Sequence, residues 1–248
     1  IRWAQFSTFC GLFLNGGHGE RALWKRSEEE LRILRTFSWL HTELVPYMYS
    51  YVVECHRGGP PLMRPVKGKY HYLFGDAFLV APVYQDSLTQ TVTLPRGRWR
   101  YLFDDTKVIE GSTTFTRDYP LEEFPAFIRD GAIIPMNVRR SYTGFGDKDS
   151  EGYLTLALYP HGGTKFAVHH ATNDEETQVA VRQESDLRIT LDGARRPHIL
   201  RILLETKPNE VLLDNVPLEE GARWAYDAPT KRLVVKTREY EVGQYVIR

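Results

Sequence analysis

The residue whose type and setting best suit chemistry is His18, in the segment FCGLFLNGGHGERALW at residues 9–24. An apolar run ends there at Asn15–Gly16–Gly17, a composition typical of a tight turn at the end of a strand. A neutral imidazole can both donate and accept a hydrogen bond, which suits the hydroxyl of a sugar. His18 is therefore a candidate substrate contact, with a structural histidine in a turn as the alternative.

Other titratable residues stand side by side, but their spacing does not bring them to one point. Asp104–Asp105 follows a predicted strand, where adjacent side chains point to opposite faces. The run at residues 174–176, Asp-Glu-Glu, lies in a polar stretch. We interpret both groups as turn or solvent-facing charges. His169–His170 is a weak indication of a metal site, and a surface pair is the favoured interpretation because no zinc spacing accompanies it.

Several classes of function lack support in the composition. The sequence contains no G-x-S-x-G nucleophile elbow and no phosphate-binding glycine loop. Lys plus Arg and Asp plus Glu number 32 each, and a formal charge of zero argues against nucleic-acid binding through bulk charge. No apolar run reaches membrane-spanning length. We predict no metal, cofactor, nucleic-acid or membrane partner, and the two cysteines leave the compartment open.

The first 57 residues carry a helical pattern. Ser27 and Glu30 form a capping box before an apolar stripe. Pro46 is expected to kink or divide the helix, and Gly58–Gly59 to end it. A helix of this length needs a partner surface, and little of the preceding sequence offers one. The expected stripe consists of Leu31, Leu34, Phe37, Leu40, Leu44, Met48 and Val52.

From residue 62 onward the pattern is that of short β-strands separated by turns. FPAFIRDGAIIP, residues 124–135, predicts a hairpin whose reversal is Asp130–Gly131, with Pro125 and Pro135 at strand ends or on an edge. The polar segment 139–152 is the best internal linker. The residues thus predict a helical portion followed by two antiparallel β domains. Strands of the second domain are expected in YLTLALY, DLRITLDG, HILRILLE, EVLLDN, RLVVKT and GQYVIR.

Six stretches, in order, resemble the C-terminal part of family 31 glycoside hydrolases, the α-glucosidase and α-xylosidase family. The resemblance covers roughly residues 1–136. The second β domain agrees with that family in type but poorly in residues, and the family's aspartate-rich motif survives only as HHATNDEE. The six stretches are RWAQFSTF, HGE, ELVPYMYSYVVECHRGGPPLMRP, LFGDAFLVAPV, LPRGRW and PLEEFPAFIRDGAIIP.

The resemblance implies an α+β fragment of a larger retaining α-glycosidase. Residues 1–60 would be the last helix-strand-helix of a (β/α)8 TIM barrel, residues 61–138 a proximal and residues 139–248 a distal antiparallel β-sandwich domain. The missing helix partner would then be the rest of that barrel. The two aspartates of the retaining mechanism would lie upstream of Ile1, leaving no catalytic residue in this chain and the chain alone inactive. Asp76, in the stretch LFGD, would be structural.

The resemblance also sharpens the expectation for His18. The family ends barrel strand eight with an arginine-any-histidine motif whose histidine binds the sugar, and His18 is the best match, although Leu14 and Asn15 stand where the arginine belongs. The implied substrate is an α-linked oligosaccharide or glycoside. The sugar, the linkage and a hydrolase, transferase or lyase outcome stay open. Alternatives are a carbohydrate-binding module using Trp99 and Trp224, or a structural subunit that completes another polypeptide's barrel.

Overall fold

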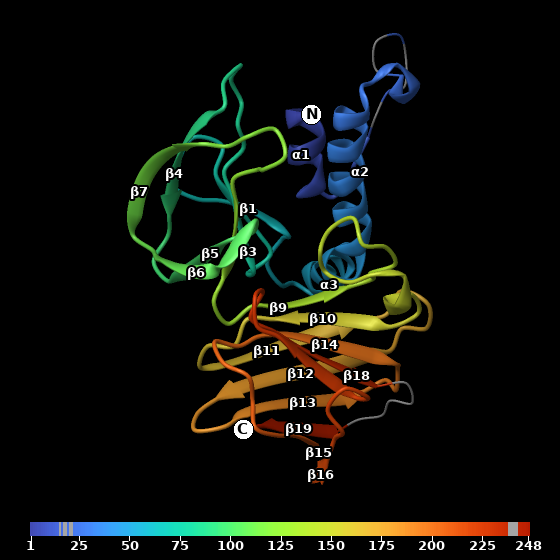
Figure 1. The fold of residues 1–248 in the computed structure, drawn as a ribbon. Helices are drawn as coiled ribbons and strands as arrows, with labels where there is room; N and C mark the ends of the chain where they lie inside the picture. Colours follow the sequence, from blue (N-terminus) through green and yellow to red (C-terminus); the bar gives the residue numbers. More distant parts are fainter. Residues whose placement is uncertain (15, 17–18, 20–21, 238–242) are drawn as a thin grey trace. The chain divides into compact units, whose positions relative to one another are not determined.

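The computed structural model describes the chain except for residues 15, 17, 18, 20, 21 and 238–242 (Figure 1). The described residues are mostly β-structure with few helices. They group into two compact units, treated separately below. Unit 1 comprises residues 1–43, 61–129 and 142–144, and unit 2 comprises residues 44–60, 130–141 and 145–248. Among the described helices, none combines the length and apolar character needed to cross a membrane.

The helices begin and end where local sequence signals predict. Glu30 N–H donates to Ser27 Oγ at 3.2 Å and Ser27 N–H donates to Glu30 Oε2 at 2.9 Å, which confirms the capping box. The predicted division is also confirmed, with Pro46 in the first turn of the second helix, where its missing N–H is tolerated. The helices are α1 (Arg2–Thr8), the 3-10 turn η2 (Leu23–Lys25), α2 (Glu28–Glu43), α3 (Val45–His56) and the 3-10 turn η3 (Lys148–Ser150).

The apolar stripe is confirmed in α2 but not at the end of α3. Phe37 and Leu40 are buried, whereas Val52 is 57% exposed and Tyr51 takes its place at 8%. The expected lack of a partner is wrong for both helices. In unit 1, α2 packs on α1 (Figure 1). In unit 2, α3 packs on strands of the sandwich, with the ring of Tyr47 stacked 5.7 Å from that of Phe166.

Unit 1 contains a six-stranded sheet of order β1-β2-β3-β8-β5-β6 and a two-stranded sheet, β4-β7, all antiparallel. Side chains from both sheets share one core, which includes Leu79, Val92, Trp99 and Phe127. The strands are β1 (Met63–Pro65), β2 (Tyr72–Phe74), β3 (Phe78–Val80), β4 (Thr89–Leu94), β5 (Arg98–Tyr101), β6 (Asp104–Glu110), β7 (Thr113–Asp118) and β8 (Ala126–Arg129).

Unit 2 is a sandwich of sheets β17-β18-β14-β10-β9 and β11-β12-β13-β19-β15-β16, with one apolar core. The prediction of purely antiparallel pairing is wrong at one place, because β10 and β14 pair in parallel. The strands are β9 (Ile133–Met136), β10 (Leu154–Leu158), β11 (Gly163–His169), β12 (Glu176–Gln183), β13 (Leu187–Gly193), β14 (His198–Leu203), β15 (Val211–Leu213), β16 (Val216–Pro217), β17 (Trp224–Asp227), β18 (Arg232–Thr237) and β19 (Gly243–Ile247).

The predicted hairpin at residues 124–135 is wrong. Gly131 has the expected positive φ of 90°. The segments on either side do not pair, however, because β8 joins β3 and β5 while β9 joins β10 in a different sheet. A glycine turn reverses a chain locally but does not specify which strand each arm will pair with. Pro135 lies on an edge strand, as predicted.

Candidate functional site

The predicted substrate contact, His18, lies outside the described residues, and its role stays a prediction. What the structure describes are the two arms of the segment that carries it. One arm runs from the end of α1 through Leu14, and the other begins at Ala22 and leads through η2 to α2. The site can therefore be built from the way these arms are held within unit 1.

The start of α1 is tied to the loop at residues 119–123. The guanidinium of Arg2 donates to the carbonyl of Glu123 at 2.8 Å and to the carbonyl of Tyr119. Gln5, fully buried, donates through Nε2 to the carbonyls of Leu121 at 2.6 Å and Glu123 at 3.2 Å. Because carbonyl oxygens only accept, these contacts orient both side chains and fix the helix on this loop.

The end of α1 is held from two other elements. Thr8 Oγ1 donates to the carbonyl of Phe37 on α2 at 3.1 Å, and His41 Nδ1 donates to the carbonyl of Thr8 at 3.1 Å. Burial lowers the pKa of His41, which favours the neutral ring. The hydroxyl of Tyr72 on β2 donates to the carbonyl of Phe9 at 2.8 Å. The described arm thus starts from a fixed point.

Beyond that fixed point the arms expose large apolar side chains. Leu12 is 68%, Leu14 66% and Trp24 83% exposed, and Trp3 on α1 is 72% exposed. Scattered exposed apolar residues are ordinary, but four within the first 24 positions indicate a surface that something else covers. The described arms of the His18 segment therefore look like one side of an interface.

The carboxylates that the sequence offered as pairs are engaged locally. Asp76 accepts from Arg64 Nη2 at 2.5 Å. Asp104 accepts from Lys107 Nζ at 2.9 Å and from Thr106, and these hydrogen bonds lower its pKa. Asp174 lies exposed in a turn at φ 52°. These contacts support the interpretation of turn and surface charges.

Glu43 is a group that sequence reasoning missed. It is fully buried at the end of α2, and burial raises its pKa to about 7. Its Oε2 accepts from Thr143 Oγ1 at 2.5 Å, while Oε1 has no hydrogen-bond partner among the described residues. The only signal was its place within the apolar stripe, between Leu40 and Leu44.

The prediction that His169 and His170 form a surface pair is wrong. They are only 5% and 6% exposed. His169 Nε2 lies 2.6 Å from Glu54 Oε1 on α3, and Arg57 lies within ion-pair distance of both Glu54 and Glu176. The arginine balances the carboxylates, so the group is a structural network. Nowhere in the described part of the chain do three or more His, Cys, Asp or Glu side chains form a group able to hold a metal.

The two tryptophans considered for sugar stacking belong to the cores. Trp99 is 1% and Trp224 4% exposed, and their indole N–H groups donate to the carbonyls of Pro95 and Leu218, each at 2.9 Å. A buried indole with its donor satisfied inside the protein presents no face to a ligand. Neither residue forms a sugar-stacking platform.

Comparison with known proteins adds a family. Residues 59–134 match the model described as the glycosyl hydrolase family 31 C-terminal domain. An α-xylosidase from Emericella nidulans is 31% identical over 56% of this chain and 20% of its own length. Neutral α-glucosidase AB from Homo sapiens is 31% identical over 65% of this chain and 19% of its own length. The chain spans about a fifth of these curated relatives.

Solved structures extend the likeness of fold to the whole chain. A GH31 dextranase from Flavobacterium johnsoniae, complexed with glucose, has a TM-score of 0.85 at 23% identity, covering 100% of this chain and 36% of its own. A cycloalternan-forming enzyme from Listeria monocytogenes, in complex with a pentasaccharide substrate, has a TM-score of 0.87 at 21% identity, covering 99% of this chain and 27% of its own. The chain therefore belongs to glycoside hydrolase family 31, as a C-terminal portion of that family.

Proposed function

We propose that the chain is the C-terminal portion of a retaining α-glycosidase that hydrolyses α-linked oligosaccharides or glycosides. The observation that carries this proposal is the family 31 match over residues 59–134, together with relatives named α-xylosidase and α-glucosidase. In this proposal residues 1–60 complete a (β/α)8 catalytic barrel, residues 61–138 form the proximal β domain and residues 139–248 the distal one.

The exposed apolar residues of the first 24 positions support a barrel partner. Trp3, Leu12, Leu14 and Trp24 would be covered by the remaining barrel helices and strands. The hydrogen bonds of Arg2 and Gln5 to the loop at residues 119–123 would then position the last barrel elements against the proximal domain.

His18 would contact the sugar from the loop between the two anchored arms. A neutral imidazole suits this task because it offers one donor and one acceptor to neighbouring hydroxyls. Catalysis itself needs two carboxylates on either side of the glycosidic bond. We place neither of them in this chain, because Asp76 and Asp104 are paired with neighbouring cations. The isolated chain would therefore lack activity.

Two assays test this proposal. The purified chain, free of host glycosidases, is expected to leave 4-nitrophenyl α-glucoside and α-xyloside intact, and enzyme-like turnover would overturn the placement of the aspartates. In the natural polypeptide that carries this segment, His18→Ala is expected to lower kcat/KM by about 2- to 150-fold through a lost hydrogen bond. His161→Ala, at an exposed turn, is the matched control and is expected to leave kcat/KM unchanged. Equal values for both variants would remove His18 from the site.

A further inference from the structure

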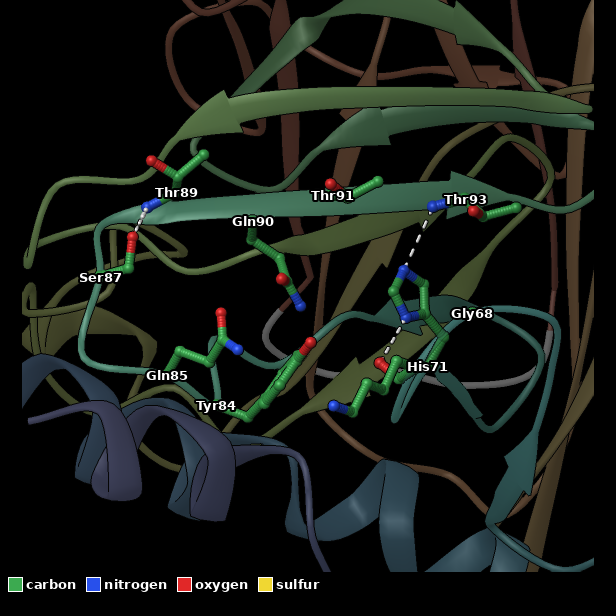
Figure 2. Close-up of a pocket in the computed structure, with 10 residues that line it drawn as sticks. Gly68, His71, Tyr84, Gln85, Ser87, Thr89, Gln90, Thr91 and Thr93 are labelled. Atoms are coloured by element: carbon green, nitrogen blue, oxygen red, sulfur yellow. Dashed lines mark hydrogen bonds between the residues drawn. The ribbon is translucent and has the colours of Figure 1, made fainter.

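A second polar site lies within unit 1, in its β-structure. A cavity of about 370 Å³ is bounded by the loop at residues 66–71, the loop at residues 81–88 and strand β4 (Figure 2). This volume falls within the range of small-molecule sites. The side chains at its wall include Tyr84, Gln85, Ser87 and Gln90.

Gln90 occupies a position where the strand pattern calls for an apolar residue. Along β4 the core-facing residues are Gln90, Val92 and Leu94, and Gln90 is only 8% exposed. Its Nε2 donates to the carbonyls of Ala81 at 3.3 Å and Pro82 at 2.6 Å. Since carbonyls only accept, the amide orientation is determined, and Oε1 faces the other way.

The acceptor Oε1 of Gln90 has no hydrogen-bond partner in the described part of the chain. Figure 2 shows the amide reaching from β4 toward the loop that carries Tyr84 and Gln85, whose side chains point toward β4. Buried polar atoms in proteins nearly always find a partner. A buried, oriented acceptor that faces a cavity therefore calls for a donor from a ligand or from solvent.

The cavity wall is preorganised by a neutral histidine. His71, 4% exposed, donates from Nδ1 to the carbonyl of Lys69 at 2.9 Å and accepts at Nε2 from Thr93 N–H at 3.2 Å (Figure 2). Burial lowers its pKa, in agreement with the neutral tautomer. A Cβ on Gly68 would lie 2.5 Å from this ring, so only glycine fits there. The loop at residues 66–71 is thus locked onto β4, which reduces the entropy lost on binding.

An aromatic pair joins the two loops at the rim. The rings of Tyr70 and Tyr84 meet edge to face at 4.9 Å, and Lys69 Nζ lies 4.5 Å from the centroid of the Tyr84 ring. Tyr70 has a left-handed φ of 61°, which is uncommon for a bulky residue. Strained residues cluster at sites where a ligand is held. This conformation places a 62% exposed ring beside Tyr84.

The lining decides the class of ligand. It contains amides, hydroxyls, a phenol and one lysine, but no carboxylate, which disfavours a metal cation. The single ammonium group lies over a ring and is a poor basis for a phosphate site. We propose that this pocket binds one unit of a neutral saccharide, with Gln90 Oε1 accepting a hydrogen bond from a sugar hydroxyl. The site is separate from the His18 segment and does not depend on a completed barrel.

The test uses the whole chain and amide-resolved NMR titration with maltotriose, isomaltotriose, xylotriose and inorganic phosphate. The choice of glucose oligosaccharides as probes rests on the proposed function. Neutral sugars are expected to shift amides at residues 84–93, and to do so equally in His18→Ala. If xylotriose shifts them and the glucose sugars do not, the pocket stands and the choice of probes fails. Shifts with phosphate alone, or none with any sugar, would overturn the pocket.

Variants sharpen the result. Gln85→Ala is expected to weaken sugar affinity about 2- to 12-fold, the range of one hydrogen bond. Gln178→Ala, an exposed glutamine on β12, is its matched control and is expected to bind as the parent does. Gln90→Met removes the buried acceptor and is expected to abolish the shifts, with its melting curve recorded alongside. If Gln85→Ala and Gln178→Ala bind equally, the assignment fails, whatever the folding of Gln90→Met.

Discussion

The distal sandwich and the first 24 residues treat their apolar side chains in opposite ways. Among the described residues of 145–248, Val216 is the one large apolar side chain that is exposed, while the strands bury a continuous core. The first 24 residues expose Trp3, Leu12, Leu14 and Trp24. A closed core is expected to stabilise its own domain, whereas an open apolar surface is expected to need a partner. The difference separates a self-sufficient module from part of an assembly.

The largest expected effect tests the closed core. Leu200, fully buried on the central strand β14, is expected to cost about 2 to 5 kcal/mol of unfolding free energy when changed to alanine. Val216→Ala, at a 64% exposed position, is the control and is expected to change little. Pulsed hydrogen exchange along a urea series reports each unit through its own peptides. A small loss for Leu200→Ala would mean that the distal core is not the source of stability.

The next effect is a pH response of unit 2. Burial lowers the pKa of His198 to about 4, and its ring accepts from the hydroxyl of Tyr245 at 2.6 Å. Between pH 6.5 and pH 4 the unfolded chain binds a proton that the folded one does not, so stability falls as pH falls. The contribution is on the order of 3 kcal/mol. His198→Gln is expected to flatten this slope, with His161→Gln as the exposed control; an unchanged slope would contradict the assignment.

Unit 1 is expected to respond to pH in the opposite direction. Because burial raises the pKa of Glu43 to about 7, the folded chain holds a proton that the unfolded chain releases above pH 4.5. Stability from this group is present below pH 4.5 and is lost as pH rises to about 7. Glu43→Gln is expected to stabilise unit 1 by about 1 to 2 kcal/mol at pH 8, and Glu28→Gln, at an exposed position, to have little effect. Destabilisation by Glu43→Gln at pH 8 would refute this account.

Local signals predicted the fold well and non-local ones did not. The Ser27 box and the Pro46 break depend on neighbours in the sequence, and both are confirmed. The hairpin failed because Asp130–Gly131 shapes only the turn, while pairing depends on distant strands. His169 and His170 were placed on the surface because the partners that bury His169, Glu54 and Ser50, lie more than a hundred residues away.

The candidate site divides in the same way. His18 came from a local glycine turn and a family resemblance, and it stays a prediction. The pocket around Gln90 carried one signal, a polar residue at a core position of an alternating strand. That signal gains meaning only when the loop at residues 66–71 is brought against β4, which His71 achieves over 22 residues of sequence. Spacing alone does not reveal such a juxtaposition.

The central claim is that this chain belongs to a larger α-glycosidase, and the intact mass of the natural polypeptide tests it most directly. Antibodies against residues 139–248 would isolate it from its source, and mass spectrometry would weigh it. A full barrel takes about 250 residues, so the account predicts at least twice the 28.7 kDa of this chain, with α-glycosidase activity in the same fraction. A mass near 28.7 kDa with no such activity would contradict it.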